Sequence, residues 1–74
     1  MNSSDNTAIG LRIRTLRKRK GYNQQELADI LSVSRQTIMA IESGRFNPSV
    51  KLALKMAALF ECDVKDLFSL EDGD

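Results

Sequence analysis

The sequence has no histidine and a single cysteine, Cys62, among its 74 residues. The lack of histidine excludes histidine-based catalytic triads and zinc deaminases, together with most other catalytic zinc sites. One cysteine cannot form an intrachain disulfide, and it cannot build a structural zinc site, which needs several cysteines or cysteines together with histidines. We therefore expect no metal centre in this chain.

Long hydrophobic runs are also missing. The longest uninterrupted apolar run, residues 56–60, spans five residues, whereas a helix that crosses a membrane needs about 20. The first residues are polar and lack the basic and then apolar pattern of a signal peptide. We expect a cytoplasmic protein with no membrane partner.

Patterns that carry catalysis are absent as well. The chain has no glycine-rich phosphate loop, no paired catalytic carboxylates and no nucleophile with an activating partner. Its 74 residues, 42% hydrophobic and 28% charged, have the composition of one small globular domain. We expect a single domain over residues 1–74, with an ordered core of about 7–70. We therefore expect neither an enzyme nor a cofactor, and no small-molecule ligand.

Charge is distributed unevenly along the chain. Residues 1–55 contain ten lysines and arginines against four acidic residues, a net charge of +6, whereas residues 56–74 contain one lysine against six acids, a net charge of −5. The stretch from Arg12 to Lys20 holds six basic residues and no acid. This asymmetry indicates a basic face for a polyanion and an acidic tail. The alternative is a solvated helix face that contributes solubility alone.

Apolar residues recur at helical spacing, and no run alternates with the period of a strand. In the first predicted helix, about residues 7–20, one face carries Ile9, Ile13 and Leu16, and Gly21 follows as its stop. Short connections between such helices are typical of an all-α domain. We predict a compact all-α fold of five helices.

Capping residues predict where the other four helices begin. The second follows Asn23 and runs to about Leu31, and the third follows Ser34 and runs to Ser43. Asn47 is the expected cap of the fourth, with Pro48 in its first turn, and this helix is expected to continue through Val50, Leu54, Ala57 and Phe60. The short fifth helix follows Asp63 and carries Val64, Leu67 and Phe68.

Residues 24–43 are the most informative segment, because they combine two short helices with a tight turn at residues 32–34. Helices joined in this way form a helix-turn-helix unit. The small Ala28 lets the two helices cross closely, and the second helix is held from below by the apolar Val33, Ile38 and Ile41. Its exposed face then carries Arg35, Gln36, Thr37, Met39 and Ala40.

These side chains are of the types that read bases in the major groove. Arginine binds guanine O6 and N7 with two hydrogen bonds, glutamine binds adenine N6 and N7, and methyl groups contact the C5-methyl of thymine. The alternative is an ordinary helical hairpin whose surface residues are solvated.

Residues 13–68 resemble the phage-repressor and Cro type of helix-turn-helix domain, also called the xenobiotic-response-element family. The resemblance rests on the segments LRKRKGYNQQELA (16–28), SRQTI (34–38), IESG (41–44), NPS (47–49) and DVKDLF (63–68). It is greatest to the short, stand-alone regulators, rather than to long repressors with a separate effector domain. The resemblance implies a five-helix DNA-binding fold.

The resemblance also implies residue roles. The residues that open the third helix contact bases, which falls on Arg35 and Gln36, with Thr37, Met39 and Ala40 as weaker candidates. The residue after the cap of the second helix, Gln24, holds a DNA phosphate and braces the first residue of the third helix. The preceding residue, Asn23, contacts the same DNA strand. The loop after the third helix contacts the DNA backbone, which falls on Arg45, Phe46 and Asn47. Arg17 and Glu42 match a structural ion pair.

Two positions depart from the pattern, since Ser32 and Glu61 stand where the family often has glycine. A non-glycine residue at positive φ is strained, although a polar residue tolerates it better than a β-branched one.

Cys62 is expected to be an inert buried thiol, with a redox or metal sensor as the alternative. Tyr22 is expected to pack against the start of the second helix, with a phosphate contact by its hydroxyl as the alternative.

We therefore expect a sequence-specific DNA-binding transcriptional regulator. As the resemblance implies, most small regulators of this kind repress by occupying promoter DNA, although an activator would use the same contacts. The alternative is a protein-interaction module, such as an antitoxin whose partner is a toxin. The operator sequence, the regulated genes, any inducer and the sign of regulation cannot be read from the chain.

A second copy of the chain is the other expected partner. One recognition helix covers about four or five base pairs, so two copies related by a two-fold axis are needed to read a pseudo-palindromic operator. Leu67 is expected to face inward, and the best candidates to cross the dimer interface are Phe68 and Leu70. The alternative is a monomer in which both residues tuck under the first helix.

Overall fold

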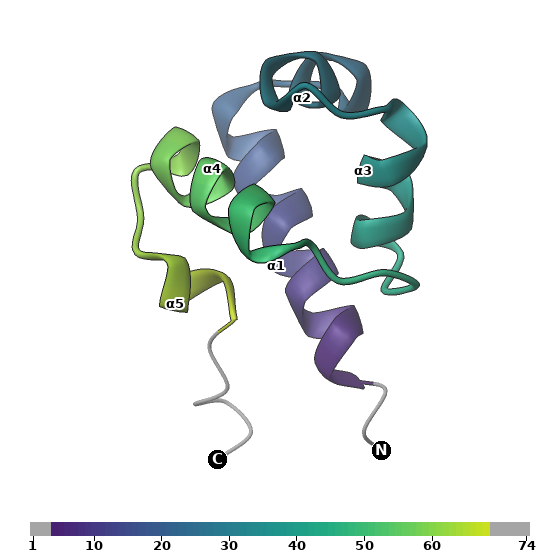
Figure 1. Cartoon of the computed structure of the whole chain (residues 1–74), viewed down its shortest axis with the longest axis vertical. Helices are drawn as coiled ribbons and strands as arrows, with labels where there is room; N and C mark the ends of the chain where they lie inside the picture. The colour runs from purple at the N-terminus through teal and green to yellow at the C-terminus, as the bar shows by residue number, and fades with distance from the viewer. Residues whose placement is uncertain (1–3, 69–74) are drawn as a thin grey trace.

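The computed structural model describes residues 4–68, with side chains from residue 8 onward. Five helices are present: α1 (Ser4–Lys20), α2 (Gln24–Leu31), α3 (Arg35–Glu42), α4 (Val50–Phe60) and α5 (Val64–Leu67). In Figure 1, α2 crosses the upper end of the molecule, α3 descends on the right, α1 passes behind α4, and α5 lies at the lower left. Residues 4–68 contain no strand, so the predicted all-α class is confirmed, and none of their helices is long and apolar enough to span a membrane.

Capping side chains set the starts of the central helices. The side chain of Asn23 accepts a hydrogen bond from the Glu26 N–H at 2.7 Å, and the Glu26 carboxylate accepts one from the Asn23 N–H at 2.8 Å. Ser34 caps α3 in the same way, because its hydroxyl accepts from the Thr37 N–H at 3.1 Å. These bonds use amide groups that a helix start otherwise leaves unpaired, and the predicted starts of α2 and α3 are confirmed.

The predicted starts of α1 and α4 are wrong. Helix α1 begins at Ser4, three residues before the expected Thr7. Helix α4 is capped by Ser49, whose hydroxyl accepts from the Leu52 N–H at 3.1 Å, and not by Asn47 with Pro48 in the first turn. Asparagine and serine cap helices about equally well, so local preference does not choose between two such residues two positions apart.

Two helices end on residues with left-handed backbone that are not glycine. Ser32 follows α2 with φ at 62°, and Glu61 follows α4 with φ at 58°. The N–H of Ser32 donates to the Asp29 carbonyl and that of Glu61 to the Ala58 carbonyl. The strain expected from the departures at these two positions is therefore present in the fold, since the left-handed region is costly for L-residues other than glycine.

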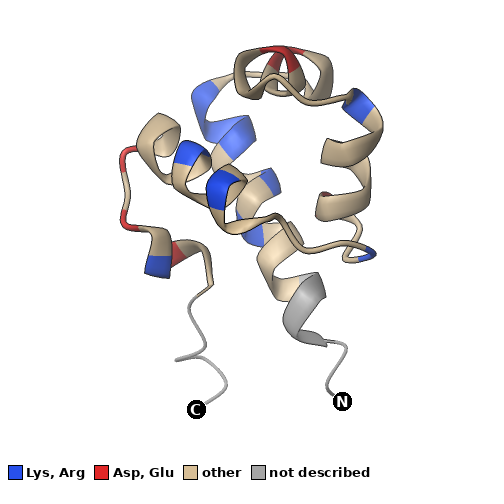
Figure 2. Ribbon diagram, viewed as in Figure 1, with Lys and Arg blue, Asp and Glu red and all other residues tan. Residues whose placement is uncertain are grey.

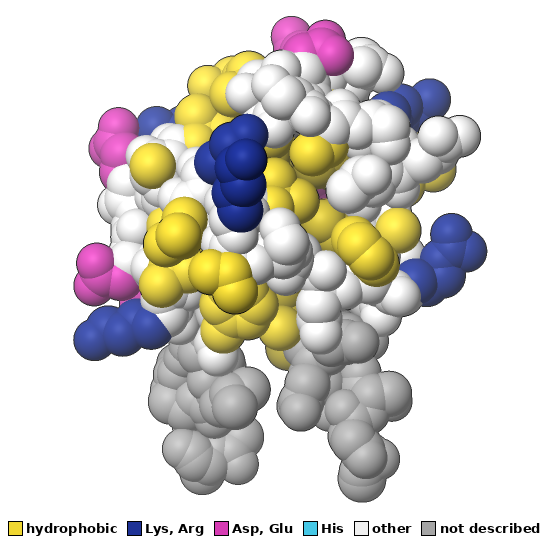
Figure 3. Space-filling view, in the orientation of Figure 1, with side chains coloured by type: hydrophobic (Ala, Val, Ile, Leu, Met, Phe, Trp, Pro, Cys, Tyr) yellow, Lys and Arg dark blue, Asp and Glu magenta, His cyan; other side chains and the backbone are white. Residues whose placement is uncertain are grey.

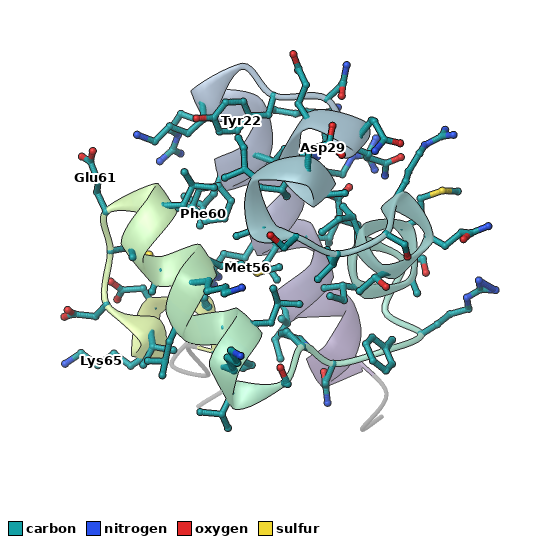
Figure 4. All side chains as sticks on the ribbon, turned by 45° about the horizontal axis from the view of Figure 1, so that its top comes forward. Tyr22, Asp29, Met56, Phe60, Glu61 and Lys65 are labelled. Carbon is teal, nitrogen blue, oxygen red and sulfur yellow. The ribbon has the colours of Figure 1, made fainter. Side chains whose placement is uncertain are left out.

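The core takes at least one side chain from every helix. The largest fully buried side chains are Ile13 of α1, Leu27 of α2, Ile38 and Ile41 of α3, Met56 of α4 and Leu67 of α5. In Figure 4, Met56 and Phe60 point inward from α4, whereas Glu61 and Lys65 point outward on the side away from α3. Such shared burial is what stabilises short helices, which are marginal in isolation.

Of the four apolar residues that the sequence predicts for α4, Ala57 and Phe60 are buried, whereas Val50 and Leu54 are 77% and 54% exposed. The residues of α4 that contact the core are Leu52, Ala53, Met56, Ala57 and Phe60. Both sets have helical spacing, so periodicity alone does not choose between them, and the packing of α4 leaves an apolar pair in solvent.

Helices α1 and α3 cross in direct backbone contact at Gly10, which is buried. A methyl group added to Gly10 would lie 2.5 Å from the Ile41 carbonyl oxygen and 2.6 Å from that of Glu42. Only a residue without a side chain allows this approach, because the neighbouring atoms belong to backbone that cannot rotate away. Gly10 therefore sets how closely α3 lies to α1.

Candidate nucleic-acid interface

The outer face of α3 presents a short row of exposed side chains. Arg35, Gln36 and Met39 are exposed, whereas Thr37 and Ala40 are half-buried. The Thr37 hydroxyl lies 3.0 Å from the Ser34 hydroxyl, with which it shares a hydrogen bond. Thr37 is therefore part of the cap, and three of the five predicted base-reading side chains extend into solvent. Figure 2 shows a basic residue at the start of α3 and another in the connection that follows it.

A buried network joins α1, α2 and α3 behind this face. The Arg17 Nε donates to Glu42 Oε2 at 2.7 Å and its Nη2 donates to Glu42 Oε1 at 3.1 Å. The Arg17 and Glu42 side chains are 8% and 5% exposed. Arg17 Nη1 also donates to the Tyr22 carbonyl at 2.8 Å. Arg17 thereby ties the end of α3 to the connection that leads into α2.

Gln24 belongs to the same network. Its amide nitrogen donates to Glu42 Oε1 at 3.1 Å. Among the described residues no hydrogen bond joins Gln24 to Arg35, so the expected brace on the first residue of α3 is replaced by one on its last residue. Gln24 and Arg35 do line the same shallow hollow, together with Asn23 and Gln25. The side chain of Gln24, for which the sequence predicts a phosphate contact, is therefore oriented by the buried ion pair.

The connection after α3 projects beside the end of that helix. Its exposed residues include Arg45, Phe46 and Asn47. The Arg45 N–H donates to the Ala40 carbonyl at 3.0 Å, and the Ser43 hydroxyl donates to the same carbonyl at 3.0 Å. These bonds fix the path of the connection relative to α3, and they leave the Arg45 side chain in solvent.

The basic residues of α1 divide between two sides of the helix. Arg14 lines a hollow shared with α2 and α3, whereas Arg12 and Arg19 line another that is shared with Cys62 and Asp66. Lys20 lies 3.5 Å from a carboxylate oxygen of Glu61. The sequence shows the run of charge but not this division, because the division depends on which helices pack against α1.

Cys62 is a free, half-buried thiol that contacts the core. Burial raises its pKa, and the nearby carboxylates of Asp66 and then Asp63 raise it further. A raised pKa disfavours the reactive thiolate, which agrees with the expected inert thiol. Within the described residues, no group of three or more metal-ligating side chains is present. Tyr22, beside the end of α1 in Figure 4, is half-buried and packs against the core, which favours the expected packing role over a phosphate contact by its hydroxyl.

The C-terminal residues expected to cross a dimer interface are placed in part. Leu67 is fully buried, as predicted, and Phe68 is half-buried against the core. Leu70 lies outside the described residues. The Arg12 guanidinium donates to the Asp66 carbonyl at 3.2 Å, which ties α5 to α1. Figure 3 shows hydrophobic side chains gathered on the side of the molecule where α4 and α5 lie.

Comparisons with known proteins agree with this arrangement. A family model described as helix-turn-helix matches residues 13–67. An HTH-type transcriptional regulator from Archaeoglobus fulgidus is 44% identical over 63 residues, which cover 85% of this chain and 90% of that protein. The competence pilus inhibition repressor of Acinetobacter baylyi is 38% identical over 65 residues, which cover 88% of this chain and 59% of that protein.

Solved structures give the same result. The restriction-modification controller protein C.AhdI from Aeromonas hydrophila matches with a TM-score of 0.80 and 32% identity, covering 89% of this chain and 96% of that one. The family match spans most of the chain and includes α2, α3 and the turn between them. The chain therefore belongs to the helix-turn-helix family of Cro and phage-repressor type, and it is a DNA-binding transcriptional regulator rather than an enzyme.

Proposed function

We propose that the protein is a repressor that binds a pseudo-palindromic operator as a homodimer, with α3 of each copy in the major groove. The observation that carries this proposal is the row of exposed side chains on α3, Arg35, Gln36 and Met39, opposite the buried Ile38 and Ile41. Arg35 reads guanine and Gln36 reads adenine, while Met39, Ala40 and the methyl group of Thr37 contact thymine methyl groups or the edges of neighbouring bases.

Backbone contacts flank this row on both sides. At the start of α2, the cap of Asn23 leaves the N–H groups of Gln24 and Gln25 to face a phosphate, and the helix dipole favours an anion there. At the other side, Arg45, Phe46 and Asn47 contact the backbone from the connection after α3. Such contacts set the position of α3 along the groove, and they carry no base preference of their own.

The dimer surface combines the end of α5 with the exposed face of α4. Figures 1 and 4 both place the end of α5 beside the first turns of α4, which carry Val50 and Leu54. An exposed apolar cluster on a small domain is an aggregation liability unless a partner covers it. We propose that Phe68 and Leu70 cross the interface together with this α4 pair.

Repression follows from occupancy, because a dimer bound over a promoter denies that DNA to other proteins. One relative of the chain is named a repressor, which supports this sign of regulation. The proposal places the protein in the cytoplasm, on the DNA it regulates. An antitoxin-type role would instead require a stable complex with a second protein.

The test is selection of binding sites from a random duplex pool, followed by gel shifts and footprinting on the selected DNA. We expect two inverted half-sites whose centres lie about one helical turn, 10–10.5 base pairs, apart. Arg35→Ala and Gln36→Ala should each weaken binding about 5- to 150-fold per half-site, corresponding to about 1–3 kcal/mol for each copy, and leave binding to random DNA nearly unchanged. Lys65→Ala removes the same charge as Arg35→Ala from the opposite side, so it should change neither.

An asymmetric site bound by one copy would contradict the homodimer, and equal losses on operator and random DNA would contradict base reading by Arg35 and Gln36. In vitro transcription from a promoter that contains the selected site decides the sign of regulation. A rise in transcript on adding the protein would contradict repression.

A further inference from the structure

A hollow of about 500 Å³ lies between α1, the start of α2 and the end of α3. Its walls include Arg14 of α1, Gln24 of α2, and Met39 and Ser43 from α3 and its cap. Met39 follows Arg35 by one helical turn, so the two side chains lie on the same face of α3. The hollow therefore borders the proposed base-reading row at the end opposite Arg35.

The electrostatics of this hollow are set by Arg14. The Glu42 carboxylate also lines it, but both of its oxygens accept hydrogen bonds from Arg17, so this pair is neutral as a unit. Arg14 is exposed, and no ion pair or hydrogen bond to its side chain occurs within residues 8–68. The hollow thus carries one uncompensated positive charge.

Gln24 adds a donor to the same place. One N–H of its amide is used by Glu42. An amide group carries two N–H donors, so the second remains for a ligand. A guanidinium and an amide N–H at one concave surface match the oxygens of a phosphate, which accept charge-assisted hydrogen bonds from arginine.

The position of Arg14 follows from the backbone contact at Gly10. Gly10 lies against the Ile41 and Glu42 carbonyls at the end of α3. Arg14 is one helical turn further along α1, so it extends from the same side of the helix toward α3. Arg19 is also exposed, but it lies on another side of α1, where its hollow is shared with Cys62 and Asp66. Helix α1 thus carries one arginine beside α3, Arg14, and a second arginine away from α3, Arg19, which serves as a control.

We propose that this hollow seats a phosphate of the bound operator and that Arg14 is its cationic ligand, with the second amide N–H of Gln24 as a further donor. The inference rests on the DNA-binding mode proposed above. It adds a contact from α1 to those at the start of α2 and after α3, and it assigns different roles to Arg14 and Arg19.

The experiment compares the salt dependence of DNA binding for Arg14→Ala and Arg19→Ala, each checked for folding by circular dichroism. Each phosphate neutralised contributes about 0.9 to the slope of log K against log salt concentration. Arg14→Ala should lower that slope by about 0.9 for each bound copy, or about 1.8 for the dimer, on operator and random DNA alike, whereas Arg19→Ala should leave it unchanged. Arg14→Lys should retain the slope, because it keeps the charge.

Phosphate ethylation interference supplies a second, positional readout. For the wild-type protein, ethylation of one particular phosphate in each half-site should block binding, and Arg14→Ala should lose sensitivity at that phosphate alone. Equal slopes for Arg14→Ala and Arg19→Ala, or an unchanged ethylation pattern, would overturn the phosphate seat. If Arg35→Ala still loses operator preference in that case, the proposed function stands without this contact; if the wild-type protein shows no operator preference, the proposed function itself fails.

Discussion

Replacing Arg17 by alanine should destabilise the protein more than any surface substitution. The change removes both hydrogen bonds to the Glu42 carboxylate and the one to the Tyr22 carbonyl. Glu42 then keeps the Gln24 amide as a partner, while its side chain is 5% exposed. A carboxylate left in that state is poorly solvated and poorly paired, which is the costly situation for a buried charge.

The magnitude follows from two comparisons. Breaking a buried ion pair by removing one partner costs about 3–5 kcal/mol. The free energy of unfolding of natural proteins is about 0.05–0.15 kcal/mol per residue, which for a chain of 74 residues gives about 4–11 kcal/mol in total. Arg17→Ala and Glu42→Ala are therefore each expected to remove a large part of the stability. The double variant should lose less than the sum, because it leaves neither charge unpaired.

Urea denaturation followed by circular dichroism measures all four proteins of this cycle. The expected coupling free energy between the two residues is about 0.5–3 kcal/mol. If a single alanine variant is unfolded without urea, the cycle is repeated with Arg17→Lys and Glu42→Gln, which keep most of the side-chain volume. Additive losses within about 0.5 kcal/mol in the cycle that can be measured would refute the coupling.

Three further predictions concern single positions. Gly10→Ala should lower the free energy of unfolding by about 1–3 kcal/mol, because its methyl group would meet two backbone oxygens. Gly21→Ala is the comparison, because a group added at the exposed Gly21 meets nothing within 4 Å and only the strain of its positive φ acts. Ser32→Gly should raise the melting temperature by a few degrees. Glycine relieves about 1–2 kcal/mol of left-handed backbone strain, which exceeds the about 0.5–1 kcal/mol of conformational entropy that glycine loses on folding. A melting temperature no higher for Ser32→Gly than for Ser32→Ala would contradict this. Alkylation of Cys62 by iodoacetamide should have its midpoint at higher pH in the folded protein than in urea, because the folded-state pKa is raised by burial, Asp66 and Asp63. By linkage, the stability that Cys62 contributes is present below the unfolded thiol pKa and is lost as the pH rises through the folded pKa, and a midpoint unchanged by folding would contradict the shift.

The apolar dimer surface supplies a fifth test. Val50→Ser with Leu54→Ser, and separately Phe68→Ala with Leu70→Ala, should each shift a micromolar sample toward monomer in sedimentation, and a wild-type monomer would contradict the interface.

Local signals in the sequence predicted much of this fold. Asn23 with Glu26 and Ser34 with Thr37 mark helix starts by bonds that span three residues, so the information lies within one turn. Such features depend on neighbours in the chain, and a single sequence contains them in full.

What the sequence did not reveal depends on packing between distant segments. Gly10 reads as a weak point in a helix, and its role appears only when the carbonyls at the end of α3 lie against it. Asn47 and Ser49 are both good caps, and the placement of α4 on the core decides between them. The same placement turns Val50 and Leu54 outward, although their spacing is compatible with a core face.

The candidate site shows the same division between local and distant causes. The sequence alone suffices to propose the side chains of α3 as base-contacting residues, because helix periodicity places Arg35 and Met39 on one face. The sequence does not predict which basic residue of α1 lies beside that face, because Arg14 and Arg19 differ only in the neighbours that α1 acquires on folding. The buried pair of Arg17 and Glu42 holds Gln24 and the end of α3 together. Its loss should therefore disturb the proposed phosphate contacts as well as the stability. A variant that stays folded but loses this pair should therefore bind all DNA sequences more weakly. The geometry of the contacts to the DNA backbone changes, while the side chains proposed to read bases, Arg35 and Gln36, are still present.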